Sequence, residues 1–492
     1  MRITRLFVTM KRISITFLVI FAISIVAGGR APRALAATNP NIIIILVDDM
    51  GYGDLACFNP ESKIPTPQID RLAASGMRFT DAHAPGPLCH VSRYGLLTGR
   101  YPFRTTFEWQ TKPVIKGNEV TIASFLKTQG YQTAMVGKWH LGFKQDAEDD
   151  YTGVLTGGPI DCGFESFFGI RASTDIPPYF YIRGERAVLP PTSTIEANNS
   201  EGWFRNQGKF WRGGAIAPDL KLDEVLPRFT EEAIGVIRDY KASKTDSPLL
   251  LYLAYPAPHT PWLPSKEFVG STRVDLYGDF MHMVDAHVGR VLSALEDADM
   301  TKDTLVIFTS DNGPTWYAAD RAKYGHDSAG PLRGMKGDAW EGGHRMPFIV
   351  SWPGRTQAAS TSAQTICFTD LLATFADITT AELPANAGPD SFSFYPVLVG
   401  EQAEDDPIRG PIVMAANNTM LIRSGDWKLI DSLRSGGFSQ EAASSSDGAT
   451  GQLYNLKADP GERNNLWLDY PERVAELSEQ LAKIKREPKT RN

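Results

Sequence analysis

The stretch NIIIILVDD, from Asn41 to Asp49, decides the fold class of this chain. Six aliphatic residues in a row, Ile42 to Val47, are followed at once by two aspartates. A short aliphatic run rich in β-branched residues is typical of a strand that is buried on both faces, as in a parallel sheet. The two aspartates mark the point where this strand ends.

Four further apolar runs recur along the chain, each ending in a polar or turn-forming cluster. They are Gln132 to Val136 before Gly137–His140, Leu249 to Ala254 before His259, Leu305 to Phe308 before Ser310–Gly313, and Phe348 to Trp352 before Pro353–Gly354. Helical patterns lie between the strands, at Thr66 to Ala74, Thr121 to Thr128 and Asp279 to Leu295. This alternation predicts an α/β fold, with a doubly wound, largely parallel sheet and helices on both faces.

The ends of these strands predict a single binding edge. In doubly wound sheets, ligands bind beyond the carboxyl ends of the strands. We therefore expect four polar clusters, those that contain Asp48, Lys138, His259 and Asp311, to converge there.

Oxygen donors stand at two of these strand ends. They are Asp48, Asp49, Asp311 and Asn312. Carboxylate and amide oxygens without histidine or thiolate partners suit a hard cation, Ca²⁺ or Mg²⁺, rather than zinc.

Basic side chains predicted at the same edge could hold an anion. They are Arg93, Lys138, His140, His259 and Lys336. Lys336 lies in the loop LRGMKG (332–337), whose glycines allow close approach of backbone to ligand. A cation, several basic groups and a nucleophile suit transfer at an anionic tetrahedral centre. For His282 and His287, on the helix with an apolar stripe, we expect structural or solvated roles.

The first 36 residues differ from the rest. Met10-Lys11-Arg12 precedes a 15-residue apolar run from Ile13 to Ala27, and Ala34-Leu35-Ala36 gives a small-x-small cleavage pattern. We expect a signal peptide cleaved near Ala36 and a secreted or periplasmic protein. The run is shorter than the roughly 20 residues of a spanning helix, so we expect no stable membrane insertion, with an uncleaved anchor as the alternative.

Charge and cysteine content exclude other classes. The 492-residue chain has a net charge of −7, and cleavage after Ala36 would remove six basic residues and leave −13. Because phosphate binding needs a basic face, we expect no nucleic-acid partner. The four cysteines show no zinc-binding spacing and allow at most two disulfides; they are Cys57, Cys89, Cys162 and Cys367.

The sequence pattern changes after about Glu401, where short strand-like segments replace the long apolar runs. We expect residues 37–405 to form the catalytic α/β domain and residues 406–492 a small α+β subdomain. Its antiparallel sheet would use Ile412 to Ala415, Met420 to Ile422 and Trp427 to Ile430, and its one helix would run from about Pro471 to Lys485.

Seven motifs, taken in order, carry a family resemblance that runs nearly from residue 40 to residue 468. They are NIIIILVDDMGYGD (41–54), CHVSRYGLLTGRYPFRT (89–105), GKWHLG (137–142), APHTPW (257–262), SDNGP (310–314), LRGMKGDAWEGGHRMP (332–347) and LYNLKADPGERNNL (453–466). Together they resemble the type I, formylglycine-dependent sulfatases of the arylsulfatase kind, in the alkaline phosphatase superfamily.

The resemblance implies a mechanism and a role for each candidate residue. A separate maturation enzyme would oxidise Cys89 to formylglycine, whose hydrate is the nucleophile, and Arg93 would hold it. Ca²⁺, with Mg²⁺ as second choice, would be bound by the four oxygen donors and by the residue at position 89. Lys138 and His140 would contact the formylglycine. Lys138, His259 and Lys336 would bind the sulfate, and His259 or Lys336 would protonate the leaving alcohol.

The sequence departs from the family motif at Val91, and the roles of two histidines stay open. Val91 stands where such motifs usually have proline or alanine, although valine favours the extended backbone that the maturation enzyme reads. His90 and His344 could face substrate or lie on the surface.

We expect a sulfatase acting on a sulfated carbohydrate, whose rings could stack on the aromatic-rich insert from Tyr179 to Trp211, or on an aryl sulfate. The alternatives are a formylglycine-dependent phosphodiesterase or phosphonate monoester hydrolase, and a sulfated-glycan-binding protein in which Cys89 stays a thiol.

Overall fold

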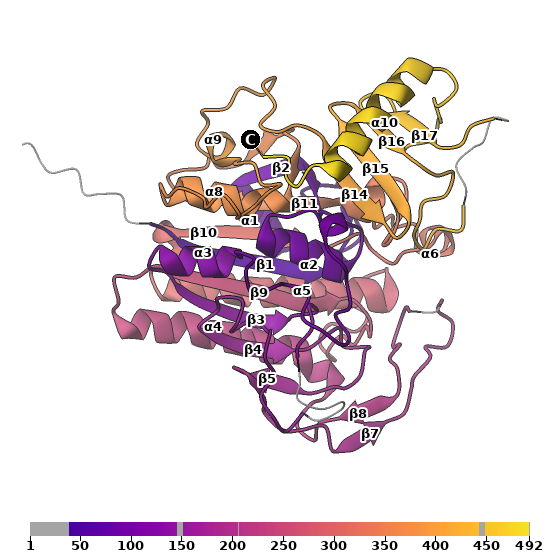
Figure 1. The fold of residues 1–492 in the computed structure, drawn as a ribbon. Coiled ribbons are helices and arrows are strands. Elements are labelled where there is room, and N and C mark those ends of the chain that lie inside the picture. The colour runs from indigo at the N-terminus through magenta and orange to yellow at the C-terminus, as the bar shows by residue number, and fades with distance from the viewer. Residues whose placement is uncertain (1–38, 145–150, 205, 442–447, 492) are drawn as a thin grey trace, which may run out of the picture. The chain divides into compact units, whose positions relative to one another are not determined.

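Strand β1 (Asn41–Asp48) lies in the middle of the largest sheet of the computed structural model (Figure 1). The structure describes residues 39–144, 151–204, 206–441 and 448–491, so the predicted signal peptide lies outside the described residues. All eight residues of β1 are buried. The strand pairs in parallel with β10 (Thr304–Ser310) on one side and β9 (Leu249–Pro258) on the other.

Among the described residues, the large sheet has the strand order β12-β2-β11-β10-β1-β9-β3-β4-β5-β6, and β13 pairs with β2. The remaining strands are β2 (Met77–His83), β3 (Gln132–Lys138), β4 (Ser166–Ile170), β5 (Tyr181–Arg183), β6 (Arg186–Ala187), β11 (Arg345–Ser351), β12 (Ser360–Ser362) and β13 (Ile366–Cys367). The five neighbours from β10 to β4 are parallel. The predicted α/β fold is thus confirmed.

The direction of β11 differs from that of the central strands. The run Phe348 to Trp352 falls largely in this strand, but β11 is antiparallel to β10 and to β2. A continuous apolar run indicates burial on both faces and carries no information about direction. Consequently, it is the start of β11 and the short helix α7 (Glu341–His344) before it that lie toward the ends of β1 and β10.

Helices cover both faces of the sheet. Side chains alternate between the faces along each strand, so a strand of aliphatic residues such as β1 is apolar on both faces and must be covered on both. Ile42, Ile44 and Leu46 of β1 pack into one core with α2 (Cys89–Thr98), α3 (Ile122–Thr128) and α8 (Leu371–Ile378). Ile43, Ile45 and Val47 pack into the other with α1 (Pro67–Ala74), α4 (Val225–Ser243) and α5 (Asp275–Asp297). Two further helices are α6 (Ala318–Tyr324) and α9 (Tyr395–Leu398).

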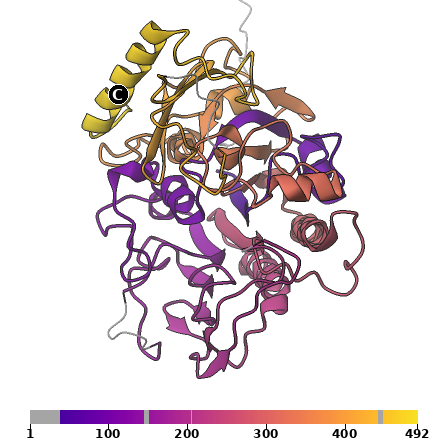
Figure 2. The same ribbon diagram turned by 90° about the vertical axis from the view of Figure 1, so that its right-hand side faces the viewer.

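The C-terminal part forms a separate four-stranded antiparallel sheet with one helix. Its elements are β14 (Ile412–Ala416), β15 (Thr419–Ser424), β16 (Trp427–Ile430), β17 (Gln452–Asn455) and α10 (Pro471–Arg486). The sequence analysis missed β17. Both views show this part at the opposite end from the pair β7 (Ser193–Ile195) and β8 (Gly214–Ile216) (Figures 1 and 2).

Residues 39–492 form one compact unit, and the division at residue 405 stays a prediction. None of the helices in the described ranges has the length and apolar character needed to cross a membrane.

Candidate active site

The ends of β1 and β10 are held together by one backbone hydrogen bond and one hydrogen bond from backbone to side chain. Asp311 N donates to Val47 O at 3.0 Å, and Asp49 N donates to Asp311 Oδ1 at 3.3 Å. Asp49 adopts a left-handed backbone conformation, with φ of 66°. Such a conformation is uncommon for a residue other than glycine and is concentrated at functional sites. Here it turns the chain sharply just beyond the strand.

The four predicted metal ligands meet at this point. Asp48, Asp311 and Asn312 are fully buried, and Asp49 is nearly so. Asn312 Nδ2 donates to Asp49 Oδ1 at 2.7 Å. Two buried oxygens, Asp48 Oδ1 and Asn312 Oδ1, have no hydrogen-bond partner among the described residues. Because an unpartnered buried oxygen is costly, this donor set fits a hard cation such as Ca²⁺.

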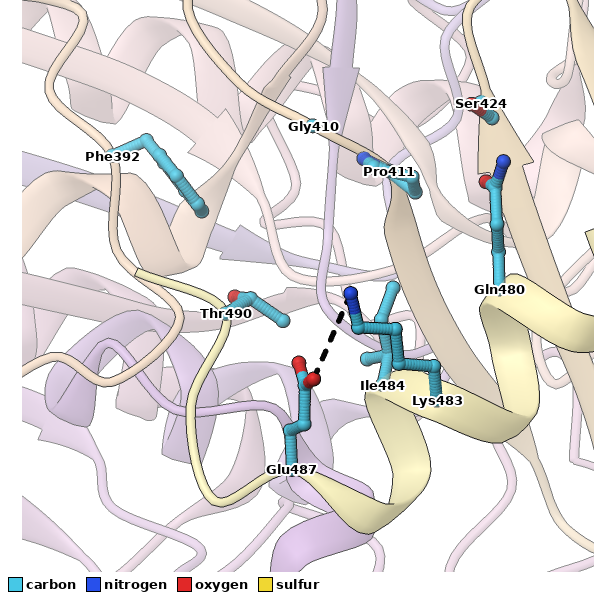
Figure 3. A pocket seen from close by; sticks show the side chains of 9 residues that line it. All are labelled: Phe392, Gly410, Pro411, Ser424, Gln480, Lys483, Ile484, Glu487 and Thr490. Carbon is cyan, nitrogen blue, oxygen red and sulfur yellow. Dashed lines mark ion pairs between the residues drawn. The ribbon is translucent and has the colours of Figure 1, made fainter. Parts of the chain in front are cut away.

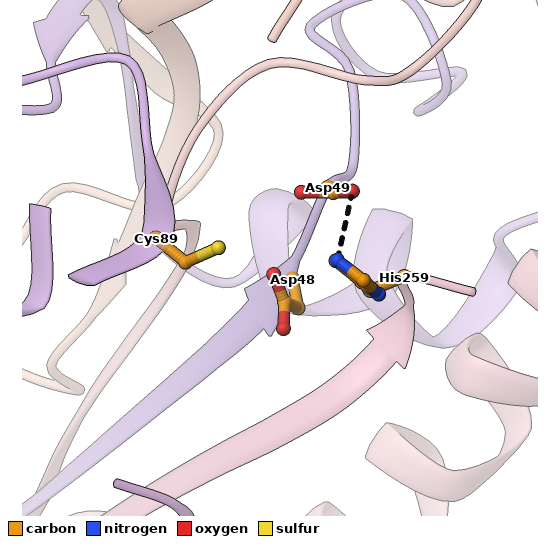
Figure 4. A group of neighbouring side chains, drawn as sticks. All are labelled: Asp48, Asp49, Cys89 and His259. Carbon is orange, nitrogen blue, oxygen red and sulfur yellow. Dashed lines mark ion pairs between the residues drawn. The ribbon is translucent and has the colours of Figure 1, made fainter. Parts of the chain in front are cut away.

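Cys89 lies against the same carboxylates (Figure 4). Its Sγ, one nitrogen of His259 and one oxygen each of Asp48 and Asp49 all lie within 4.8 Å of one another. Cys89 is the first residue of α2, where the helix dipole favours negative charge. Nevertheless, burial raises the pKa of its thiol to about 11, although Lys138 and Lys336 oppose the shift. An unmodified Cys89 is therefore a poor thiolate nucleophile at neutral pH.

Arg93 connects the helix of Cys89 to the metal ligands. It lies one turn after Cys89 in α2 and is fully buried. Its Nε and Nη2 donate to Asp311 Oδ2 at 3.0 and 2.7 Å, and its Nη1 donates to Lys138 O at 3.0 Å. Arg93 thus fixes the position of a predicted metal ligand.

Two lysines place positive charge beside the aspartates. Lys138 Nζ donates to Asp48 Oδ2, and Lys336 Nζ donates to Asp49 Oδ1 at 2.5 Å. Burial opposes ionisation of Asp48, but nearby positive charges, chiefly Lys138, hold its pKa below the ordinary value. The loop of Lys336 is anchored by its backbone, because Lys336 N donates to Pro314 O at 2.9 Å and Gly337 N to Pro87 O at 2.8 Å.

His140 and His259 differ in how they are held. His140 has a left-handed φ of 61°, and neither ring nitrogen has a hydrogen-bond partner among the described residues. Burial, reinforced by Lys138, holds its pKa well below the ordinary value, so its ring is neutral. His259 donates from Nδ1 to Thr260 O at 2.8 Å, which leaves Nε2, 3.7 Å from Asp49 Oδ2, to exchange a proton.

The polar clusters at the strand ends thus converge as the sequence predicts.

The family model described as Sulfatase matches residues 40–381. The chain belongs to the sulfatase family. The protein is accordingly an enzyme that hydrolyses sulfate esters.

Relatives of this sulfatase match over most of their length. It is 34% identical to N-acetylgalactosamine-6-O-sulfatase of Bacteroides thetaiotaomicron, over 91% of this chain and 93% of the relative. It is 32% identical to human arylsulfatase A, over 89% and 87% of the two chains. A solved structure, described under metabolism of multiple glycosaminoglycans by Bacteroides thetaiotaomicron, has a TM-score of 0.79 and 32% identity, over 92% of this chain and all of that chain.

The structure also places residues of the sulfatase that the sequence analysis did not identify. The Trp109 ring lies 4.3 Å from that of His140, centroid to centroid, and Asp175 Oδ1 lies 3.9 Å from His259 Nδ1. Both come from irregular loops, where no periodicity or motif marks them. The left-handed conformations of Asp49 and His140 likewise carry no sequence signal, because neither residue is glycine.

The two histidines left open by the sequence have different surroundings. The ring of His90 packs 5.5 Å from that of His140, next to the site. His344 is 1% exposed, lies near Ala339 O at 3.2 Å and neighbours Lys428. The surface role considered for His344 is therefore wrong, and its role facing substrate stays a prediction. His287 is buried and hydrogen-bonds to Thr230, in keeping with a structural role.

Proposed function

We propose that this sulfatase hydrolyses O-sulfate esters of a carbohydrate, with formylglycine formed from Cys89 by a separate maturation enzyme and with one bound Ca²⁺. The observation that carries the proposal is the position of Cys89 against Asp48, Asp49 and His259, within 4.8 Å. Asp48, Asp49, Asp311 and Asn312 would hold the cation. The unpartnered oxygens of Asp48 and Asn312 support that assignment.

Formylglycine at position 89 and Ca²⁺ would supply the nucleophile and its activation. The hydrated formylglycine would offer an oxygen nucleophile, and Ca²⁺ would offer positive charge that favours the ionised form of that oxygen. The side chains of the protein do the rest. Lys138 and Lys336 bring two ammonium groups to the site, where they would bind sulfate oxygens and offset developing negative charge.

Proton transfer is divided between the two histidines. We assign protonation of the leaving alcohol to His259, because its Nδ1 is committed to Thr260 O and only Nε2 faces the site. Lys336 is less suited to this step, because it is held by Asp49 at 2.5 Å. His140, neutral and without a hydrogen-bond partner in the described part of the chain, is placed to accept a proton. A well-placed acid or base contributes about 10²–10⁴-fold to the rate.

The substrate class follows from the relatives and is part of the proposal. Because a relative matched over 93% of its length is named an N-acetylgalactosamine-6-O-sulfatase, 6-sulfated N-acetylgalactosamine is the first ester to try. We also propose that residues 1–36 act as a signal peptide and that the protein is exported.

The experiment measures sulfate release by protein produced together with a maturation enzyme. We expect hydrolysis of 6-sulfated N-acetylgalactosamine, loss of activity after chelation, and recovery with Ca²⁺. A Cys89→Ser variant should lose at least about 10³-fold in rate, since it lacks the nucleophile. Faster hydrolysis of an aryl phosphate diester, or recovery with Mn²⁺ but not Ca²⁺, would favour the phosphodiesterase alternative.

A further inference from the structure

A pocket of about 500 Å³ lies beside the loop that carries Lys336. It is lined by residues 330–332, by Gly461, and by three arginines and two carboxylates, namely Arg321, Arg333, Arg463, Asp327 and Glu441. The chain as a whole has a net charge of −7. The lining of this pocket has one more positive than negative side chain, whereas the chain as a whole is negative. The pocket therefore attracts anions.

This arginine pocket is connected to the candidate active site through the backbone. Arg333 precedes Lys336 by three residues, which span at most about 11 Å. Arg333 O accepts from Gly342 N at 2.7 Å, and Gly313 N, next to Asn312, donates to Gly343 O at 3.0 Å. The pocket and Lys336 therefore share one loop, whose backbone is hydrogen-bonded to the segment that follows Asn312.

The three arginines are engaged to different degrees. Arg333 stacks over the Trp340 ring at 3.6 Å, donates to Glu462 O at 2.8 Å and lies 4.0 Å from Glu441 of the pocket, so its guanidinium is fixed. Arg321 pairs with Asp327 at 3.0 Å. Arg463 is exposed, and its guanidinium makes no ion pair or hydrogen bond with the residues that the structure describes. The pocket thus combines a preorganised guanidinium with an uncommitted one.

A second cavity, of about 330 Å³ beneath α10, has no excess of positive charge (Figure 3). Its single lysine, Lys483, lies 3.8 Å from Glu487 in the same cavity, so the charges of its lining are balanced. This cavity carries no inference of its own, but it offers a matched site for a control substitution.

We propose that the arginine pocket binds a second anionic group of the glycan, a sulfate ester or a uronate carboxylate, on a sugar near the one whose ester is hydrolysed. The planar guanidinium fork matches the oxygens of either group. This inference rests on the proposed function and adds to it a substrate class. The preferred substrates are glycan fragments that carry more than one anionic group.

The test measures binding by calorimetry to the full-length Cys89→Ser protein, which does not consume the ligand. The ligands are a monosulfated monosaccharide, an oligosaccharide with a second sulfate, and an oligosaccharide with a uronate but no second sulfate. Arg463→Gln should weaken binding of one or both oligosaccharides by about tenfold, the loss of one charge-assisted contact, and leave the monosaccharide unchanged. Arg463→Lys should retain part of the affinity, and Lys483→Gln should have no effect.

The results separate this inference from the proposed function. If Arg463→Gln binds every ligand as Lys483→Gln does, or loses affinity for the monosaccharide equally, the pocket proposal is wrong. Loss for only one oligosaccharide identifies its anion as the group that is bound. The proposed function fails instead if the matured wild-type protein releases sulfate from none of the three ligands. The binding comparison still decides the pocket in that case, because it does not depend on turnover.

Discussion

At the scale of single residues, the site combines groups that would be costly without a ligand. Asp48 Oδ1 and Asn312 Oδ1 are buried without a partner among the described residues. The residue types of the site were predictable, because a carboxylate-rich cluster behind a buried strand suits a hard cation. Their exact roles were not, because contacts such as that of Arg93 with Asp311 depend on how α2 packs against the sheet.

Replacing Asn312 tests the cation at this scale. At a Ca²⁺ concentration 100 times the dissociation constant, Ca²⁺ binding should stabilise the wild-type protein by about 2.7 kcal/mol. Asn312→Leu should lose most of that gain, since one oxygen ligand is removed. The measurement is the shift of the melting temperature with Ca²⁺ concentration. The control Asn118→Leu, at an exposed position, should keep the full shift; equal shifts in both variants would contradict a ligand role for Asn312.

At the scale of elements, burial was easier to predict than direction or pairing. The run that became β11 was recognisable as a buried strand, but its antiparallel direction depends on the connection through α7. Strand β17 is only four residues long, follows a glycine- and serine-rich segment, and is defined by its pairing with β16. Helices α1, α3 and α5 carry a strong local signal, and Thr121 caps α3 through a hydrogen bond from Ser124 N.

The contact between α4 and α5 predicts an effect of pH on stability. His287 of α5 hydrogen-bonds to Thr230 of α4 at 2.9 Å, and burial, reinforced by Arg290, lowers its pKa to about 4. The unfolded state therefore takes up a proton at higher pH than the folded state does. Stability should fall as pH drops below about 6.5, by up to about 3 kcal/mol from this group.

The check compares urea midpoints at pH 7.5 and pH 5. A His287→Gln variant can still hydrogen-bond to Thr230 but no longer titrates, so its midpoint should change less with pH than that of the wild type. His282→Gln, at a half-exposed histidine of the same helix whose pKa burial also lowers, is the matched control and should change the pH dependence less than His287→Gln does. A pH dependence of His287→Gln as steep as that of the wild type would rule out this contribution.

At the scale of the whole molecule, buried charges join the small sheet to the large one. Lys428 of β16 is fully buried and lies 2.9 Å from Glu341 Oε1 of α7 and 2.8 Å from Glu462 Oε1. Arg423 of β15 likewise pairs with Asp81 of β2. His83 and His344 lie beside Glu341 and could in principle bind a metal with it. However, Lys428, Arg423 and Arg345 already offset the three carboxylates of Glu341, Glu462 and Asp81. No sequence pattern predicts such long-range pairs, since their partners lie far apart in the chain.

Removing Lys428 should destabilise the whole unit. Lys428→Met removes the buried ammonium group that contacts both Glu341 and Glu462 and should cost about 3–5 kcal/mol in the free energy of unfolding. Adding Glu462→Gln should recover part of that loss. The measurement is equilibrium unfolding in urea, with Lys112→Met, from an exposed ion pair, expected to cost less than about 1 kcal/mol. A similarly small cost for Lys428→Met would show that the pair does not join the two sheets energetically.

The central claim is that Cys89 is converted to formylglycine despite the valine at position 91. The most direct measurement is mass spectrometry of the peptide containing Cys89, from protein made in its native host or together with a maturation enzyme. The account predicts the mass of the aldehyde or its hydrate in most molecules. An unmodified thiol in most molecules, alongside a control sulfatase that did mature, would contradict it and favour a protein that binds sulfated glycans without hydrolysing them.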